Sequence, residues 1–177
     1  MAKSCPSSSG QIAPPFVAID SGKSSSITST SASSGGTITS DGLGSITAKG
    51  VVWSTSTEPT IALSTKTSNG SGSSNFTSSI TGLAPVTKYY VRSYATNSGG
   101  TGYGAEVSFT TLAGLAVLTT SNATSITITS AILGGEVTNE GGAAVSEKGV
   151  VWNTLTAPTV SNNKQATGTG LGAFTTS

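Results

Sequence analysis

Apolar and polar positions alternate most clearly along residues 83–97. Pro85 fixes its own φ and lacks an N–H, which favours a turn, and the residues after it alternate with the period of two that an extended strand gives. One side of this strand would carry Tyr89, Val91, Ser93 and Ala95, and the other Tyr90, Arg92, Tyr94 and Thr96. The pattern predicts a turn followed by a long, half-buried strand.

Other short apolar or alternating segments predict further strands, because Gly, Asp, Ser and Pro bound them. They are residues 16–19, 27–38, 46–53, 76–80 and 104–109. Residues 65–74 are rich in Gly and Ser and predict a connection. Short strands separated by turns, with no helical periodicity, predict an all-β sandwich.

The sequence also repeats itself. A shift that places Lys148 on Lys49 matches the whole segment Lys-Gly-Val-Val-Trp and brings Trp152 onto Trp53. The repeat predicts one sandwich over residues 16–111 and a second copy over 112–177 that stops before the counterpart of residues 83–97. Two explanations stay open. The copy belongs to a longer protein, which we favour, or a neighbouring chain completes it by strand addition.

Composition limits the range of functions. Charged residues make up 8% of the chain, against about 25% in ordinary soluble domains, so Ser and Thr hydroxyls must form much of the surface. The formal net charge is +1, and Lys and Arg do not cluster. These features argue against a nucleic-acid partner, which would need concentrated positive charge.

The residues needed for chemistry are scarce. The chain has no histidine, which excludes His-based catalysis and His metal sites, and one cysteine, which cannot form a zinc site alone. The seven carboxylates are scattered along the sequence. We therefore expect no enzyme activity, no catalytic residues, no cofactor and no metal.

Residues 1–15 form a polar leader rich in Ser and Pro. Such a segment cannot bury enough apolar surface to order itself. It is either a loose end or a docking arm that orders against a partner, and the candidate docking residues are Cys5, Gln11, Ile12, Pro14 and Pro15. The leader lacks the apolar core of a secretion signal, and no apolar run approaches the ~20 residues of a membrane span. We expect no membrane insertion.

The outward side of the long strand offers one candidate surface contact, formed by Tyr90, Arg92 and Tyr94. These side chains could bind a ligand or partner. Residues of this kind more often cover a sheet surface or pack on a neighbouring copy.

The corner before the long strand resembles the turn between strands E and F of fibronectin type III domains, where a tyrosine hydroxyl bonds back to the backbone. The resemblance gives structural roles to the two tryptophans and the corner residues, namely Trp53, Trp152, Leu83, Pro85, Thr87, Tyr89 and Val91. One feature departs from the family: the tryptophan of its second strand is absent, and Trp53 and Trp152 fall on the third. The Gly-Val-Val-Trp strand, with Asn-Ser-Gly-Gly-Thr-Gly-Tyr-Gly over 97–104, resembles tandem repeats of Bacteroidota surface proteins and their phages.

The resemblance and the repeats lead us to expect a non-enzymatic virion protein of a bacteriophage, such as a head fibre, a capsid decoration or a tail-associated protein. Its N-terminal arm would anchor it, and its partners would be capsid or other virion proteins, or neighbouring copies in a homo-oligomer. Weak binding to host-surface glycans is a further expectation of this class. The alternative is a fragment of a bacterial cell-surface adhesin or carbohydrate-associated protein.

Overall fold

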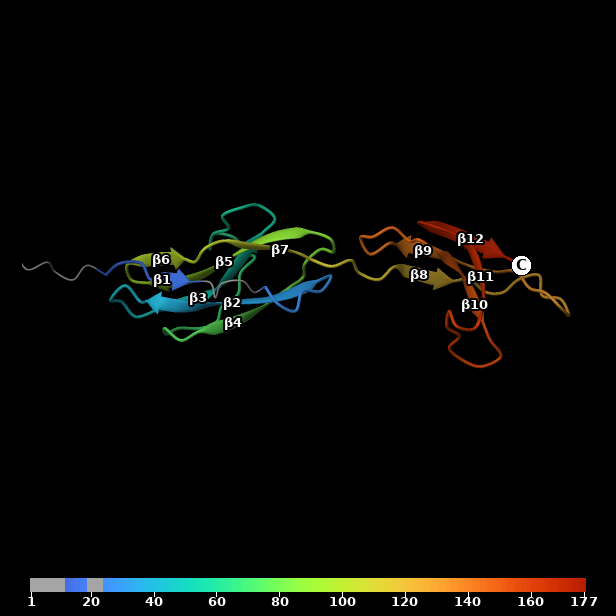
Figure 1. Ribbon diagram of the computed structural model, residues 1–177, viewed down its shortest axis with the longest axis horizontal. Helices are drawn as coiled ribbons and strands as arrows, with labels where there is room; N and C mark the ends of the chain where they lie inside the picture. The colour runs from blue at the N-terminus through green and yellow to red at the C-terminus, as the bar shows by residue number, and fades with distance from the viewer. Residues whose placement is uncertain (1–11, 19–23) are drawn as a thin grey trace, which may run out of the picture. The chain divides into compact units, whose positions relative to one another are not determined.

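The computed structural model describes residues 12–18 and 24–177, and within them it contains β-strands and no helix. The described residues therefore form no helix that is long and apolar enough to span a bilayer. The chain divides into unit 1, Met1–Leu112, and unit 2, Ala113–Ser177. The fold is all-β (Figure 1), with tandem immunoglobulin-like β-sandwich repeats, which confirms the fold class predicted from the sequence.

Unit 1 is built from two antiparallel sheets. One has the order β1-β2-β4, and in the other β5 lies between β3 and the successive strands β6 and β7. The strands are β1 (Phe16–Ala18), β2 (Ser31–Ser40), β3 (Ala48–Ser54), β4 (Phe76–Thr81), β5 (Lys88–Asn97), β6 (Gly100–Tyr103) and β7 (Val107–Thr110). Ile19, the last residue of the first predicted strand, lies outside the described residues.

The core of unit 1 lies between these two sheets. In β2 every second residue is buried, starting at Ala32 and ending at Ile38, as in a strand with one face against the core. The central cluster contains Ala32, Val51, Ile80, Leu83, Val91 and Phe109, and Trp53 and Tyr89 pack against it half-buried.

The connection over residues 65–70 runs along the free side of β3. Trp53 N donates to Thr65 O at 3.0 Å, Thr67 N donates to Val51 O at 2.8 Å, and Asn69 N donates to Lys49 O at 2.7 Å. Because β5 pairs with the other side, β3 has backbone partners along both edges.

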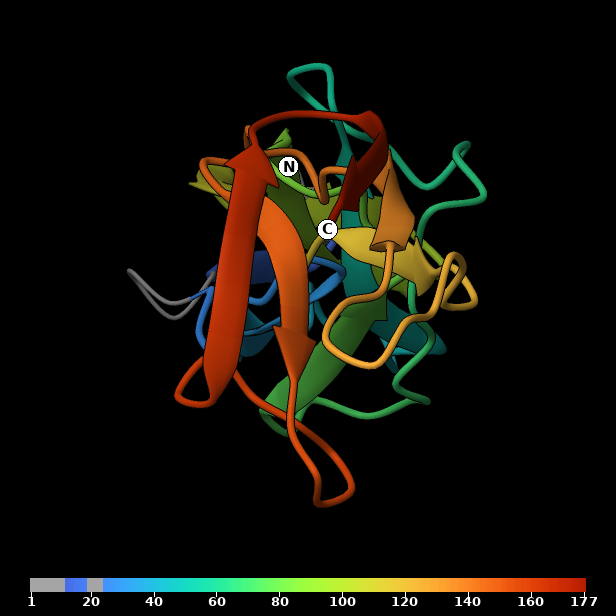
Figure 2. The same ribbon diagram turned by 90° about the vertical axis from the view of Figure 1, so that its right-hand side faces the viewer.

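Unit 2 repeats part of this arrangement. One sheet has the order β12-β9-β8, and β10 and β11 form a separate hairpin, side by side in Figure 2. The strands are β8 (Val117–Thr120), β9 (Leu133–Asn139), β10 (Lys148–Trp152), β11 (Asn163–Gly168) and β12 (Gly172–Thr176). Val137, Val150 and Phe174 form its core. Residues 113–177, all of which the structure describes, contain no counterpart of β5, β6 or β7.

The predicted arm must be shortened, because its last residues belong to unit 1. Ala13 N donates to Gly42 O at 3.0 Å, and Asn97 Nδ2 donates to Ala13 O at 2.7 Å. Pro15 is buried. A side chain at Gly99 would collide with the backbone of this segment, so the glycine makes room for it. Ile12, Pro14 and Pro15 are therefore parts of the sandwich, not free docking residues, and Cys5 and Gln11 lie outside the described residues.

Candidate functional site

Tyr89 closes the corner between β4 and β5. Its hydroxyl accepts a hydrogen bond from Ala84 N at 3.0 Å, five residues upstream, and its ring stacks on Phe109 with centroids 5.9 Å apart. Leu83 is buried below the corner. This is the geometry of a tyrosine corner, in which an aromatic side chain fixes the entry of a central strand.

Thr111 also stabilises this corner, a role that no pattern in the sequence indicated. Its hydroxyl donates to Ala84 O at 2.6 Å and accepts from Thr87 N at 2.9 Å. Thr87 Oγ1 in turn donates to Pro85 O at 2.8 Å. Thr111 is buried, so the network satisfies backbone groups that the turn would otherwise leave without partners. The corner is a structural element.

Tyr94 does not belong to a surface contact. It is only 5% exposed, and its hydroxyl donates to Thr67 O at 2.6 Å. The segment over 65–70 covers this face, which corrects the prediction that Tyr94 faces solvent. Burial, with a smaller contribution from the charge of Tyr103, raises the pKa of Tyr94 above its ordinary value.

The other two members of the predicted contact are half-buried and engaged within their own sheet. The Arg92 guanidinium lies 4.6 Å from the centroid of the Tyr103 ring, and Arg92 Nε donates to Gly104 O at 3.2 Å. The Lys88 ammonium lies 5.0 Å from the centroid of the Tyr90 ring. These cation–π pairs favour the sheet-covering interpretation of Tyr90 and Arg92.

Lys49 is a buried cation that the sequence interpretation overlooked. It is 3% exposed, and its ammonium donates to Gly72 O at 3.0 Å, Ser74 O at 2.8 Å and Ser74 Oγ at 2.9 Å. It also lies 5.8 Å from the centroid of the Phe76 ring. The hydrogen bonds offset the cost of removing the charge from water. Lys49 thereby holds the connection over residues 65–74 close to the start of β4.

Unit 2 contains an equivalent lysine, Lys148, and we call Lys49 and Lys148 the braces of their units. Lys148 Nζ donates to Leu171 O at 2.9 Å and to Gly172 O at 3.2 Å, and it lies 5.8 Å from the centroid of the Phe174 ring. The repetition of both Lys and Phe in the two copies was the signal in the sequence that could have identified this pair.

The two tryptophans differ in their surroundings. Trp53 is half-buried against the core, whereas Trp152 is 43% exposed.

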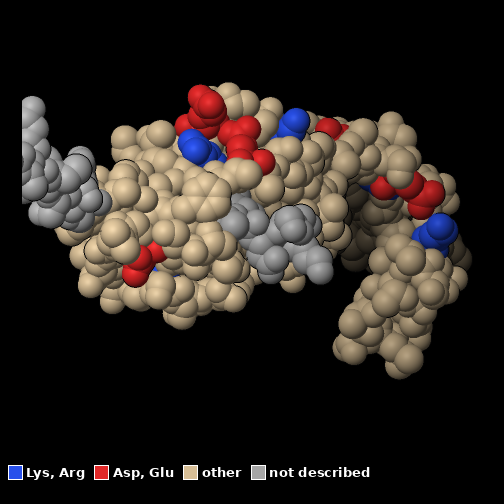
Figure 3. Space-filling view, turned by 60° about the vertical axis from the view of Figure 1, so that its left-hand side comes forward, with Lys and Arg blue, Asp and Glu red and all other residues tan. Residues whose placement is uncertain are grey.

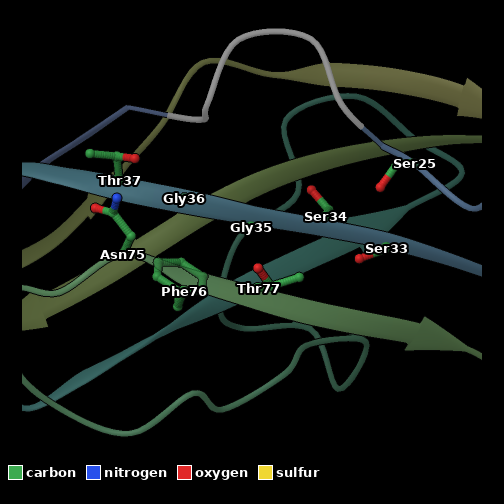
Figure 4. Close-up of a pocket in the computed structure, with 9 residues that line it drawn as sticks. All are labelled: Ser25, Ser33, Ser34, Gly35, Gly36, Thr37, Asn75, Phe76 and Thr77. Atoms are coloured by element: carbon green, nitrogen blue, oxygen red, sulfur yellow. The ribbon is translucent and has the colours of Figure 1, made fainter.

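A polar hollow of about 320 Å³ lies beside β2 and the start of β4 in unit 1. Figure 4 shows that its walls carry mainly hydroxyl and amide groups around the ring of Phe76. They come from Ser25, Ser33, Ser34, Gly35, Gly36, Thr37, Asn75, Phe76 and Thr77. Such walls offer neutral hydrogen-bond donors and acceptors and an apolar ring edge, but no charge.

Charged side chains are few on the face of the molecule that Figure 3 shows. Lys164 and Glu147 form an ion pair with 3.4 Å between nitrogen and oxygen, and both side chains are more than half exposed. Within the described residues, no three acidic or cysteine side chains gather in a way that could hold a metal ion.

Comparison with protein-family models and with curated proteins gives no match. Among solved structures, the chain is similar to a crystal structure of domains A168-A170 from titin, at 20% sequence identity and a TM-score of 0.38. The similarity covers 56% of this chain and 32% of the titin chain. The chain thus spans about a third of the length of that structure.

Proposed function

We propose that this chain is a non-enzymatic structural module, made of fibronectin type III-like repeats that project from a larger protein assembly. One observation carries the proposal: several of the residues that both copies retain serve packing. They are the braces Lys49 and Lys148, the core valines Val51 and Val150, and the aromatic partners Phe76 and Phe174. Tandem repeats that retain their packing residues fit a structural role.

The assembly that we propose is a bacteriophage virion, in which the chain serves as a head fibre, a capsid decoration or a tail-associated protein. The neutral, hydroxyl-rich surface and the resemblance of the repeats support this assignment. Its partners would be capsid or other virion proteins and neighbouring copies of the chain. Residues 1–11 remain the proposed docking segment, now without Ile12, Pro14 and Pro15.

Fractionation of the natural source tests the assignment. An antibody raised against the recombinant chain is applied to density-gradient fractions of phage particles and to cell-envelope fractions of the host. We expect the chain to follow infectious particles. Enrichment in the envelope fraction of uninfected cells would overturn the virion assignment in favour of a bacterial adhesin.

Binding of host-surface glycans stays a prediction, and the polar hollow beside β2 is the place to test it. Replacing Thr77 with Lys adds a long charged side chain at its wall, on an exposed position of β4. We expect this change to abolish any glycan signal on an array. A retained signal would exclude the hollow as the binding site.

A further inference from the structure

The polar hollow beside β2 has bare backbone where two strands of unit 1 come close together. A side chain at Gly35 would collide with Phe76 O, and a Cβ at Gly36 would lie 3.0 Å from the Phe76 ring. Both glycines line the hollow and contribute only backbone to its wall. The space that remains is about 320 Å³, at the lower end of the range of about 300–1,000 Å³ for ligand pockets. It has room for one small ring-shaped ligand.

The side chains around this space are uncharged donors and acceptors of hydrogen bonds. Asn75 and Thr77 are exposed at its wall, and Ser33 and Thr37 are half-buried. A hydroxyl or a carboxamide can both donate and accept. None of the described residues that line the hollow is charged. Such a wall suits a ligand that carries several hydroxyls and no charge.

One hydroxyl of the wall lacks a partner. Ser34, which Figure 4 shows next to Gly35, is 4% exposed, and its Oγ makes no hydrogen bond with any residue that the structure describes. Buried polar groups are nearly always hydrogen-bonded, so each exception needs an explanation. A ligand hydroxyl in the hollow would supply the missing partner.

The second copy shows that the fold does not require this polar wall. Unit 2 retains the two glycines and the aromatic ring as Gly134, Gly135 and Phe174, paired in the same register. At the positions of Ser33, Ser34, Thr37 and Asn75 it carries Ile132, Leu133, Glu136 and Ala173. Residues needed for packing recur in both copies, as the phenylalanine does. The polar set belongs to unit 1 alone, and packing does not account for it.

We propose that the hollow binds one uncharged sugar ring of a glycan. The hydroxyls of the sugar form hydrogen bonds with Ser34, Asn75 and Thr77, and its C–H groups pack on the half-buried ring of Phe76. A few polar groups around an aromatic side chain are typical of small-ligand sites. An acidic sugar would lose hydration without gaining a cationic partner from the described wall, so it is disfavoured. The inference rests on the glycan binding predicted under the proposed function and does not need the virion assignment.

Saturation-transfer NMR on the full chain tests this site. The probes are the methyl glycosides of glucose, galactose and N-acetylglucosamine, with N-acetylneuraminic acid as the charged control, each at about 10 mM, which is tenfold above a Kd of 1 mM. We expect transfer to at least one neutral sugar and none to the acidic sugar. Titration with the bound sugar should shift the amide signals of Gly35, Gly36 and Thr77.

Unit 2 supplies the matched variants. Asn75→Ala and Thr37→Glu introduce the residues that the second copy has at these positions, so the fold should tolerate them. Together they should weaken sugar binding about tenfold, as expected for the loss of one or two hydrogen bonds. Thr77→Ala should also weaken it, whereas Thr175→Ala, at the same position of unit 2, should leave it unchanged. Thermal melting of each variant checks that the fold is intact.

Three results would refute the site. They are no transfer to any neutral sugar, unchanged binding in the Asn75→Ala, Thr37→Glu chain, and nuclear Overhauser contacts of residues 19–23 with the Phe76 ring in the free chain, which would mean that the chain itself fills the hollow. A chain that follows infectious particles but binds none of the sugars would refute the site and leave the virion assignment intact. A chain that binds a neutral sugar but is found in the envelope of uninfected cells would do the reverse.

Discussion

Replacing Lys49 with Met tests whether the buried lysine stabilises unit 1 or only tolerates burial. Methionine retains most of the apolar stem and removes the ammonium, which makes three hydrogen bonds and contacts the Phe76 ring. A hydrogen bond to a charged group contributes about 1.5 to 3 kcal/mol and a partly desolvated cation–π contact about 1 kcal/mol. Burial of the charge opposes them by several kcal/mol. We expect the free energy of unfolding of unit 1 to fall by about 2 kcal/mol.

Lys148 supplies the matched control for this variant. Its ammonium makes two hydrogen bonds, at 2.9 and 3.2 Å, and the residue is only half-buried. Lys148→Met should therefore lower the free energy of unfolding of unit 2 by about 1 kcal/mol, half the effect in unit 1.

Guanidinium chloride titration measures both effects by tryptophan fluorescence. Lys49→Met is read through Trp53 in a chain with Trp152→Phe, and Lys148→Met through Trp152 in a chain with Trp53→Phe. Equal slopes of the transitions are needed for the comparison of midpoints. If Lys49→Met left unit 1 equally stable or made it more stable, the free-energy cost of burying the charge would equal or exceed the stabilisation by its hydrogen bonds. The buried lysine would then not stabilise the unit.

Three further variants test other parts of unit 1. Tyr89→Phe removes the hydrogen bond to Ala84 N and should cost about 1 kcal/mol; an unchanged melting temperature would show that the hydroxyl does not hold the corner. Ser93→Ala should stabilise by about 1 kcal/mol, because its fully buried hydroxyl has no hydrogen-bond partner among the described residues; a loss of stability in urea titration would contradict this. Tyr94 has a raised pKa in the folded chain, so its hydroxyl ionises at a lower pH in the unfolded chain. The free energy that Tyr94 contributes to folding is therefore constant below pH about 10 and is lost as the pH rises further. Denaturation midpoints between about pH 9 and 11 should show a fall that Tyr94→Phe reduces, and an equal fall in that variant would refute the assignment.

Periodicity was enough to predict most strands of unit 1, whereas β6 and β11 were not predicted. Alternation along residues 83–97 predicted the long strand β5, and the repeated Gly-Val-Val-Trp placed Trp53 and Trp152 on equivalent strands, β3 and β10. Both signals are local in sequence or compare one copy with the other. They required no knowledge of which loop crosses which face.

The errors arose where a loop or a terminal segment crosses a strand. Alternation placed Tyr94 on the outer face of its sheet, but it could not reveal that residues 65–70 cover that face. Composition suggested that residues 12–15 are free, whereas Gly99 and Gly102 leave room for their backbone. Lys49 was overlooked because lysine is rarely buried, and its carbonyl partners come from residues more than twenty positions away. These contacts depend on tertiary structure alone.

The way the chain enters and leaves unit 1 determines how the domain would carry a mechanical load. Asn97, at the end of β5, holds the entering segment through Ala13 O, whereas Thr110, at the end of β7, lies opposite Lys88 at the start of β5. Entry and exit therefore lie at opposite ends of a ten-residue strand, roughly 30 Å apart at about 3.3 Å per residue. Tension between them acts along the strands and shears the hydrogen bonds of β1 and β7 together instead of opening them one at a time. We therefore expect the domain to resist stretching.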